Sequence, residues 1–199
     1  MRIFILGAGA IGSLFGGHLA QHHEVTLICR EGHADAVNEA GLKITGLSDM
    51  HVHPTAVVKT DGLKPPEVLF LTVKSCDTES SLADVRALLS PETVLVSLQN
   101  GLGNLETLSD AFPEAELVAG ITSQGAILRS PGVVEHTGRS YTILGGRQAR
   151  PIADMLTASG LETSVSEDIR AEIWYKAIVN SAINPLGTLL KGRNGIVLE

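Results

Sequence analysis

A lysine and two asparagines follow one another at four-residue intervals near the end of the chain: Lys176, Asn180 and Asn184. A four-residue step turns about 400° on an α-helix, so the three side chains lie near one face. The positions between them are mostly apolar, which predicts a largely buried helix within residues 169–186, where a cation and two amides need partners. A lysine there can protonate a developing alkoxide, and amides can hold the polar groups of a substrate. The same spacing also fits a polar stripe facing solvent, or asparagines that cap and bend the helix at Pro185.

A glycine-rich turn follows the apolar run of residues 1–6, which is typical of a buried parallel strand. Because residues 13–20 are typical of a helix, the motif Gly-x-Gly-x-x-Gly has the strand–turn–helix setting of a dinucleotide-binding turn. Gly7 permits the tight turn, Gly9 lets a pyrophosphate approach the backbone, and Gly12 allows close helix–strand packing. The helix N-terminus supplies N–H groups to the phosphates. A turn without a ligand is the alternative. We expect the cofactor to contact Gly7, Ala8, Gly9, Ala10, Ile11 and Gly12.

The second predicted strand, residues 24–29, leads into Arg30 and Glu31. Enzymes that use NAD usually place Asp or Glu at this point to bind the ribose 2′-hydroxyl. A guanidinium instead pairs with the oxygens of a 2′-phosphate. The sequence therefore favours NADP over NAD, with Glu31 free to face solvent or bind a ribose hydroxyl. His33, just beyond, is expected in a surface loop rather than as a ligand.

Segments typical of strands and of helices alternate along the chain as far as residue 166. The predicted strands are 1–6, 24–29, 42–45, 51–58, 68–73, 93–98, 117–128, 133–136, 141–144 and 162–166. The predicted helices are 13–20, 34–40, 78–89, 105–111 and 152–159. This alternation predicts an α/β fold with a parallel sheet and right-handed crossovers. We place a dinucleotide-binding Rossmann domain at residues 1–167 and a second region, which begins with the long apolar helix, at 168–199.

Two polar residues follow predicted strands at the edge where ligands of open α/β sheets bind. Lys74 comes after the strand 68–73 and can neutralise a cofactor phosphate or contact a ribose. Asn100 comes after the strand 93–98 and can orient the nicotinamide or a substrate carbonyl. A solvated lysine at a helix start and a turn asparagine are the alternatives. Their joint placement at one sheet edge favours a functional role for both.

The composition is that of a folded protein, with 44% hydrophobic and 19% charged residues. The formal net charge of −7 argues against nonspecific nucleic-acid binding. Cys29 and Cys76 are too few for a disulfide framework, which is typical of a reducing compartment, and we expect a cytoplasmic protein. No stretch is long and apolar enough to span a membrane, and no metal site is expected.

Together these features resemble the ketopantoate reductase (2-dehydropantoate 2-reductase) family over essentially the whole chain. The matching motifs are Gly7-x-Gly9-x-x-Gly12, Arg30, Thr72-Val73-Lys74, Gln99-Asn100-Gly101-Leu102-Gly103, Val134-Glu135-His136-Thr137-Gly138 and Lys176-x-x-x-Asn180-x-x-x-Asn184-Pro185-Leu186. Many dehydrogenases share the glycine motif, whereas the lysine–asparagine helix together with Asn-Gly-Leu-Gly is far more specific. The resemblance implies an NADP-dependent oxidoreductase that reduces ketopantoate to pantoate with NADPH, on the route to pantothenate and coenzyme A.

The resemblance also implies roles for individual residues. Lys176 would be the general acid for the carbonyl oxygen. Substrate binding, or positioning of the lysine, would fall to Asn100, Asn180 and Asn184. Arg30 and Lys74 would contact the phosphate or ribose of the cofactor. Ala126 matches the small-residue stretch that lies beside the nicotinamide, although a plain strand alanine fits the position nearly as well.

Members of this family are commonly longer, and their later helices supply a serine and a glutamate to the substrate. This chain stops at Glu199, so we expect a Rossmann domain followed by the first long helix of an otherwise missing all-helical domain. A reductase paralogue for another 2-oxo acid, and a nucleotide-binding fragment without turnover, are the alternatives. The apolar residues between Ile169 and Leu190 are spread too widely to form one face against the Rossmann domain alone, so this region should form a homodimer or lack order.

Overall fold

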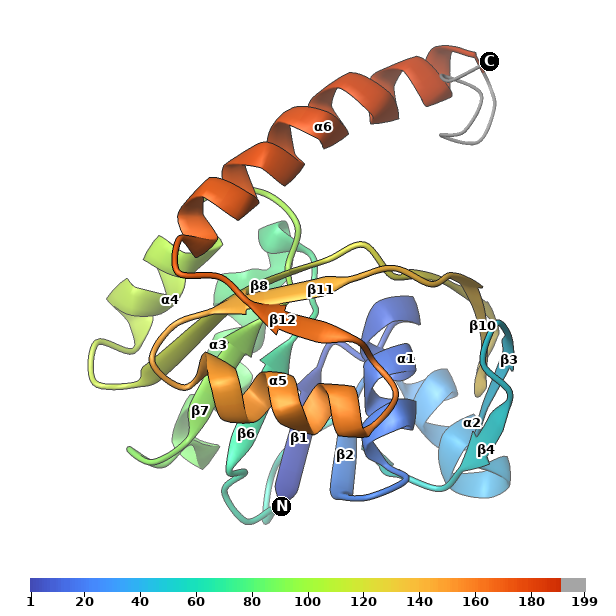
Figure 1. Ribbon diagram of the computed structural model, residues 1–199. Coiled ribbons are helices and arrows are strands. Elements are labelled where there is room, and N and C mark those ends of the chain that lie inside the picture. Colours follow the sequence, from blue (N-terminus) through green and yellow to red (C-terminus); the bar gives the residue numbers. More distant parts are fainter. Residues whose placement is uncertain (191–199) are drawn as a thin grey trace.

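The computed structural model describes residues 1–190 as a large sheet, a smaller sheet and the helices around them (Figure 1). The large sheet has the order β12-β11-β8-β7-β6-β1-β2-β5. Its strands are β1 (Arg2–Leu6), β2 (Glu24–Ile28), β5 (Thr55–Val57), β6 (Val68–Leu71), β7 (Val94–Ser97), β8 (Glu116–Thr122), β11 (Thr142–Gly145) and β12 (Thr163–Val165). From β5 across to β8 the neighbours all run parallel, which confirms the predicted Rossmann-type α/β core.

The far edge of the large sheet differs from the prediction, because β11 runs antiparallel to β8. Between them the chain makes no helix and instead builds half of the small sheet, so it returns in the opposite sense. The small sheet has the order β4-β3-β10-β9, formed by β3 (Leu42–Gly46), β4 (Met50–Val52), β9 (Gly125–Ser130) and β10 (Val133–Gly138). Two predicted strands, 51–58 and 117–128, are therefore each divided between the two sheets.

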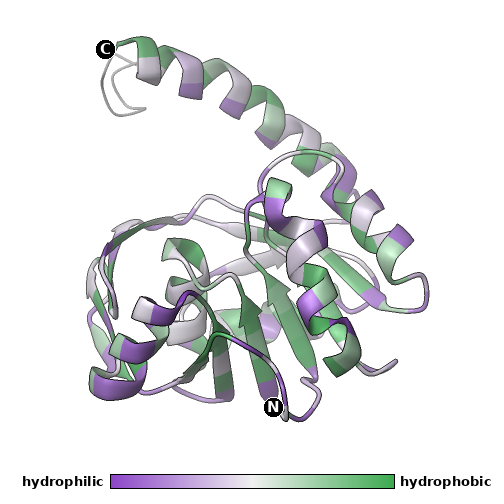
Figure 2. Ribbon diagram, turned by 180° about the vertical axis from the view of Figure 1, so that it is seen from behind, coloured by the Kyte–Doolittle hydropathy of each residue, from purple (hydrophilic) through white to green (hydrophobic). Residues whose placement is uncertain are grey.

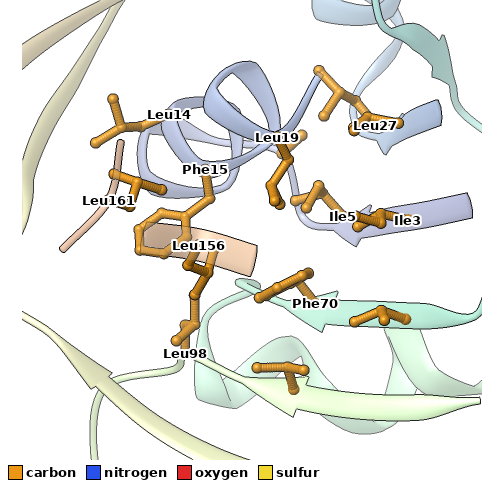
Figure 3. Close-up of a cluster of buried hydrophobic side chains, with 14 of the residues drawn as sticks. Ile3, Ile5, Leu14, Phe15, Leu19, Leu27, Phe70, Leu98, Leu156 and Leu161 are labelled. Atoms are coloured by element: carbon orange, nitrogen blue, oxygen red, sulfur yellow. The ribbon is translucent and has the colours of Figure 1, made fainter. Parts of the chain in front are cut away.

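Helices cover both faces of the large sheet. They are α1 (Ala10–Leu19), α2 (Glu31–Ala40), α3 (Thr78–Val85), α4 (Asn104–Ala111), α5 (Ala149–Ala158) and α6 (Ile169–Leu189), with short 3-10 turns η1 (Ser75–Asp77) and η2 (Arg86–Leu88). Side chains of β1 alternate between the two resulting cores, since successive residues of a strand point to opposite faces. Ile3 and Ile5 pack with α1 and α5, where Phe15 lies at the centre (Figure 3). Phe4 and Leu6 pack with α3 and α4.

Helix α6 projects away from the two sheets (Figures 1 and 2). Among its residues only Gly187 is buried, so the prediction of a largely buried helix is wrong. The side chains of Trp174, Tyr175 and Ile178 are 58%, 65% and 63% exposed. The reason is that only the beginning of the helix packs on β8 and β11, and no other part of residues 1–190 covers the remainder. The helix continues through Pro185, and the rest of the predicted second region, 191–199, lies outside the described residues.

Candidate active site

The glycine turn between β1 and α1 is shaped by three glycines that meet different surroundings. Gly7 has a φ of 89°, and a Cβ there would lie 2.4 Å from Val73 Cγ1. A Cβ on Gly12 would lie 2.5 Å from Thr72 Oγ1 and 2.8 Å from the Gly7 carbonyl oxygen. At Gly9 the nearest such atom is 3.9 Å away, so that position faces open space. Two glycines are thus required by packing, while the third leaves room for a ligand.

The first turn of α1 lies next to this open space. Gly9 is the N-cap residue, and no side chain caps the helix. The backbone N–H groups of Gly7 and Ala8 both donate to the Ile28 carbonyl oxygen at 3.0 Å, which ties the turn to the end of β2. An uncapped helix N-terminus carries partial positive charge and suits the phosphates of a dinucleotide. These surroundings fit the predicted contacts of the cofactor with residues 7–12.

Arg30 stands at the end of β2, as predicted, and is the N-cap residue of α2 in an extended conformation. Its side chain is exposed and forms no ion pair within residues 1–190, so the guanidinium is available to a phosphate. Glu31 begins α2 and is also exposed. The exposed Lys74 follows β6 at the same edge of the sheet and is the N-cap residue of η1, without a side-chain capping bond.

His33 does not lie in a surface loop, which corrects the prediction. It is 6% exposed within α2, where Gly132 N donates to Nδ1 at 3.0 Å. Nε2 therefore carries the proton and donates to Ser13 Oγ, 3.0 Å away. Ser13 in turn donates to the Ala8 carbonyl oxygen at 3.1 Å. Burial lowers the pKa of His33, and the neutral ring satisfies this chain, which supports the glycine turn from below.

Lys176 meets the end of β7 and the end of β8. Its Nζ donates to Asn100 Oδ1 at 2.8 Å and to the Thr122 carbonyl oxygen at 2.5 Å. Burial lowers the pKa of the ammonium group. The structure thus brings together Lys176 and Asn100, which the sequence places 76 residues apart. A cation held at this edge by two acceptors can present its remaining N–H to a ligand.

Asn180 and Asn184 lie further along α6 than Lys176. Each four-residue step advances about 6 Å along the axis, so the two amides stand progressively further from Asn100. Asn180 is half-buried and Asn184 is exposed. Ala126 is half-buried in β9, opposite His136, and packs against the core beside α1.

Two residues that support the site were given no role of their own from the sequence, although Gln99 lies within the matching motif of residues 99–103. Gln99 is 7% exposed, and its Nε2 donates to Val73 O at 3.1 Å and to Thr78 Oγ1 at 2.7 Å, joining the loops after β6 and β7. Asn104 Nδ2 donates to the Asn100 carbonyl oxygen at 3.1 Å and fixes the loop before α4. The partners of Gln99 lie 21 and 26 residues away, so their contacts could not be predicted from local sequence, whereas Asn104 bonds within its own loop.

The first turn of α6 is anchored beside this loop. Arg170 pairs with Glu106 of α4 at 2.9 Å. Asp168 Oδ1 accepts from Ala171 N at 3.1 Å and caps the helix. A cavity of about 150 Å³ lies between α4 and α6, lined in part by Ile173 and Trp174. Residues 1–190 contain no cluster of three or more metal-ligating side chains and no helix with the length and apolar content to cross a membrane.

Comparison with solved structures supports the fold. A PanE/ApbA family ketopantoate reductase from Ralstonia eutropha JMP134 is 31% identical, with a TM-score of 0.89 over 96% of this chain and 65% of that one. D-mandelate dehydrogenase, solved with NADH and anilino(oxo)acetate, is 30% identical, with a TM-score of 0.88 over 96% of this chain and 65% of that one.

Curated relatives agree. The 2-dehydropantoate 2-reductase of Pyrococcus abyssi is 44% identical over all of this chain, and that of Archaeoglobus fulgidus is 35% identical. In both cases the match covers 67% of the relative, so the chain spans about two thirds of the length of these proteins. The family model described as ketopantoate reductase PanE/ApbA matches residues 3–148, the part that holds the glycine turn, Arg30, Lys74 and Asn100. With the lysine of α6 meeting that asparagine, these matches show that the chain belongs to the ketopantoate reductase PanE/ApbA family.

Proposed function

We propose that this chain carries the cofactor site and the proton donor of an NADPH-dependent reductase that converts ketopantoate to pantoate. The observation that supports this most strongly is the meeting of Lys176 with Asn100 and the Thr122 carbonyl oxygen at the ligand-binding edge of the sheet. The names of the Pyrococcus abyssi and Archaeoglobus fulgidus relatives support the choice of substrate.

The residues of the glycine turn fit a dinucleotide. The open space at Gly9 and the uncapped start of α1 suit the pyrophosphate, and the exposed Arg30 suits a 2′-phosphate. Lys74 would contact the phosphate or ribose, and Ala126 would lie beside the nicotinamide. When bound, the cofactor supplies the hydride that reduces a carbonyl carbon.

Lys176 would provide the proton. Two of the three N–H groups of its ammonium are directed to Asn100 and Thr122, which leaves one for the carbonyl oxygen of a 2-oxo acid. Because burial lowers the pKa of the lysine, its proton moves more readily to a developing alkoxide. The positive charge also stabilises that alkoxide before the proton moves. We propose that Asn180 and Asn184 hold other polar groups of the substrate.

A reductase for a different 2-oxo acid is the second candidate. The D-mandelate dehydrogenase neighbour is described with an aromatic oxo acid and with NADH, at an identity similar to that of the reductase from Ralstonia eutropha JMP134. A nucleotide-binding fragment without turnover is the third, because the matched reductases extend beyond the region shared with this chain.

One set of measurements separates the three. Isothermal titration with NADPH and NADH tests the cofactor site, and loss of NADPH absorbance with ketopantoate or with an aromatic 2-oxo acid tests turnover. We expect NADPH binding, and turnover of ketopantoate in preference to the aromatic acid. Preference for the aromatic acid would favour the second candidate, binding without turnover the third, and failure to bind either nucleotide would refute the proposal.

We further propose that the protein is a cytoplasmic enzyme of small-molecule metabolism, without a nucleic-acid partner, that forms a homodimer through α6. The support for the dimer is the exposed apolar surface around Trp174, Tyr175 and Ile178. Cys29 and Cys76 are free thiols, in keeping with a reducing compartment. Sedimentation of the chain across a concentration series tests the dimer.

A further inference from the structure

Two connections between the sheets lie side by side next to the lysine site. One, Thr122–Gly125, takes the chain from β8 to β9, and the other leads from β10 to β11. Gln124 is 7% exposed and joins them, since its Nε2 donates to the Ser140 carbonyl oxygen and its Oε1 accepts from Ser140 N at 3.3 Å. Gln124 N also donates to Thr122 Oγ1 at 3.2 Å. The carbonyl of that threonine is the one that receives Lys176 Nζ.

A chain of buried groups reaches Gln124 from the other side. His18 Nδ1 donates to the Ser159 carbonyl oxygen at 2.8 Å, and its Nε2 lies 3.2 Å from Ser48 Oγ. Ser48 Oγ lies 2.8 Å from His136 Nδ1. His136 Nε2 lies 3.0 Å from Gln124 Oε1. The two histidines are 5% and 2% exposed, and Ser48 is 8% exposed, so water cannot readily replace these partners.

The direction of each bond follows from counting protons. His136 Nε2 faces two acceptors, Gln124 Oε1 and the Gly138 carbonyl oxygen at 3.2 Å, so this nitrogen must donate. Turning the Gln124 amide over would set its oxygen against Ser140 O and its nitrogen against Ser140 N–H, so the amide orientation is fixed as well. Neutral His136 is therefore protonated on Nε2 and accepts at Nδ1 from Ser48.

One link in this chain then lacks a proton when both rings are neutral. Ser48 donates its only hydroxyl proton to His136, and neutral His18 donates its only ring proton to the Ser159 carbonyl oxygen. The contact without a proton is His18 Nε2 with Ser48 Oγ, and at 3.2 Å it is longer than the 2.8 Å contacts on either side. A proton added to the chain should therefore go to His18 Nε2, and His136 should keep its tautomer.

We propose that Gln124 is a positioning residue for Lys176, and that the His18–Ser48–His136 chain orients it by holding His136 as the Nε2–H tautomer. Gln124 fixes the turn whose Thr122 carbonyl receives the lysine ammonium, so its side chain sets the direction of the proton donor without touching substrate. The role of Lys176 as the acid rests on the proposed function, whereas the positioning itself does not.

The two histidines of the His18–Ser48–His136 chain should become protonated in a defined order as the pH falls. Burial lowers the pKa of His18 and of His136, and His136 and Arg139 lower that of His18 further, while the Ser159 carbonyl raises it. His18, Gln124 and His136 line one cavity, and the other charged or titratable side chains among its lining residues are those of His22, Arg139 and Glu162. Proton uptake by His18 completes the hydrogen bonds, whereas uptake by His136 would displace the Ser48 proton, so His18 should charge first.

The first test needs no variant and no turnover. Long-range nitrogen–proton NMR spectra of the histidine rings report which nitrogen of each carries the proton. We expect neutral His136 to be protonated on Nε2 and neutral His18 on Nδ1, with His18 the first of the two to become charged as the pH falls. A neutral His136 protonated on Nδ1, or one that charges before His18, would overturn the proposed orientation.

The second test uses Gln124→Met, which keeps the length of the side chain and removes its hydrogen bonds. Gln21→Met is the matched control, because Gln21 lines the same cavity but donates to the His18 carbonyl oxygen at 3.2 Å rather than to the Thr122 turn. Titration of Lys176 by NMR follows the ammonium directly. We expect Gln124→Met to lower the pKa of Lys176 by about 0.5 or more, since a carbonyl acceptor moves away, and Gln21→Met to leave that pKa unchanged.

If the protein reduces ketopantoate, the rate of turnover is a second, separate measurement. In that assay Gln124→Met should lower kcat about tenfold and change the Kd for NADPH less than about twofold, because only the proton donor is misdirected. If the protein is inactive, the NMR titration of Lys176 still tests the positioning role. An unchanged pKa of Lys176 in folded Gln124→Met would refute the positioning role, and so would an equal change in Gln21→Met.

Discussion

Gly9 and Gly12 lie three residues apart in one turn, and substituting each with alanine should damage different properties. A Cβ on Gly9 meets nothing closer than 3.9 Å, so the fold should accept Gly9→Ala at a cost below about 1 kcal/mol, mostly from a poorer N-cap. The methyl group would instead occupy the space where a pyrophosphate approaches the backbone. We expect NADPH binding to weaken by at least about 2 kcal/mol, or roughly 30-fold in Kd.

Gly12→Ala should show the reverse balance. Its Cβ would lie 2.5 Å from Thr72 Oγ1, 2.8 Å from the Gly7 carbonyl oxygen and 3.0 Å from Ile5 Cγ2. The hydroxyl cannot move away freely, because it donates to the carbonyl oxygens of Leu6 and Gly7 at 3.1 and 2.9 Å. Overpacking of this kind costs about 1–3 kcal/mol, or roughly 2–4 °C in Tm per kcal/mol at this chain length.

Thermal unfolding and isothermal titration with NADPH, performed on both variants, decide the matter. We expect Gly9→Ala to lose NADPH binding while keeping most of its Tm, and Gly12→Ala to lose the larger share of its Tm. Normal NADPH binding by Gly9→Ala would refute the assignment of the open space to the pyrophosphate. A larger loss of Tm in Gly9→Ala than in Gly12→Ala would refute the packing argument.

Four other outcomes are expected. Arg30→Ala should remove most of a preference for NADPH over NADH, a loss of about 1–3 kcal/mol that paired titrations measure; equal Kd values in the unmutated protein would contradict it. Lys176→Ala should lower ketopantoate turnover by about two to four orders of magnitude, and a variant with near-normal rates would show that the lysine is structural. In the unmutated protein, turnover should fall as the pH rises through the lowered pKa of Lys176, because only the ammonium form donates a proton. The free energy of unfolding should decrease as the pH falls below about 6.5, the ordinary histidine pKa, because the pKa of His33 is lowered in the folded protein and protonation would displace the Gly132 N–H. Chemical denaturation across this pH range should show a smaller decrease for His33→Gln than for the unmutated protein. Trp174→Ser should weaken self-association in sedimentation, and a chain that is monomeric at all concentrations would show that α6 is not the interface.

The sequence was sufficient for those parts of the site that depend on local pattern. An apolar strand, a glycine turn and a helix follow one another within residues 1–20, so β1, its turn and α1 could be predicted together. The strand ends at Lys74 and Asn100 could be located in the same way, because a parallel sheet places the ends of its strands at one edge.

Other features depend on contacts between distant residues and left no such pattern. Alternation along the chain could not show that β11 returns antiparallel, since that depends on the small sheet formed between β8 and β11. His33 has a polar side chain next to a strand end, so the sequence predicted a surface position. Its burial follows from Ser13 and Gly132, which lie 20 and 99 residues away.

The apolar composition of α6 predicted burial, yet only the start of the helix is held. A Cβ on Gly145 would lie 2.3 Å from Ile169 Cβ, so this glycine lets the helix approach β11 closely. The ion pair of Arg170 with Glu106 adds a second attachment one residue later. Lys176 lies less than two turns beyond, so its position is determined by these contacts and by its own bonds at the sheet edge. Asn180 lies beyond the attached part of the helix. The four-residue spacing predicted both Lys176 and Asn180 as site residues, but the attachment brings only Lys176 to Asn100 and the Thr122 carbonyl oxygen.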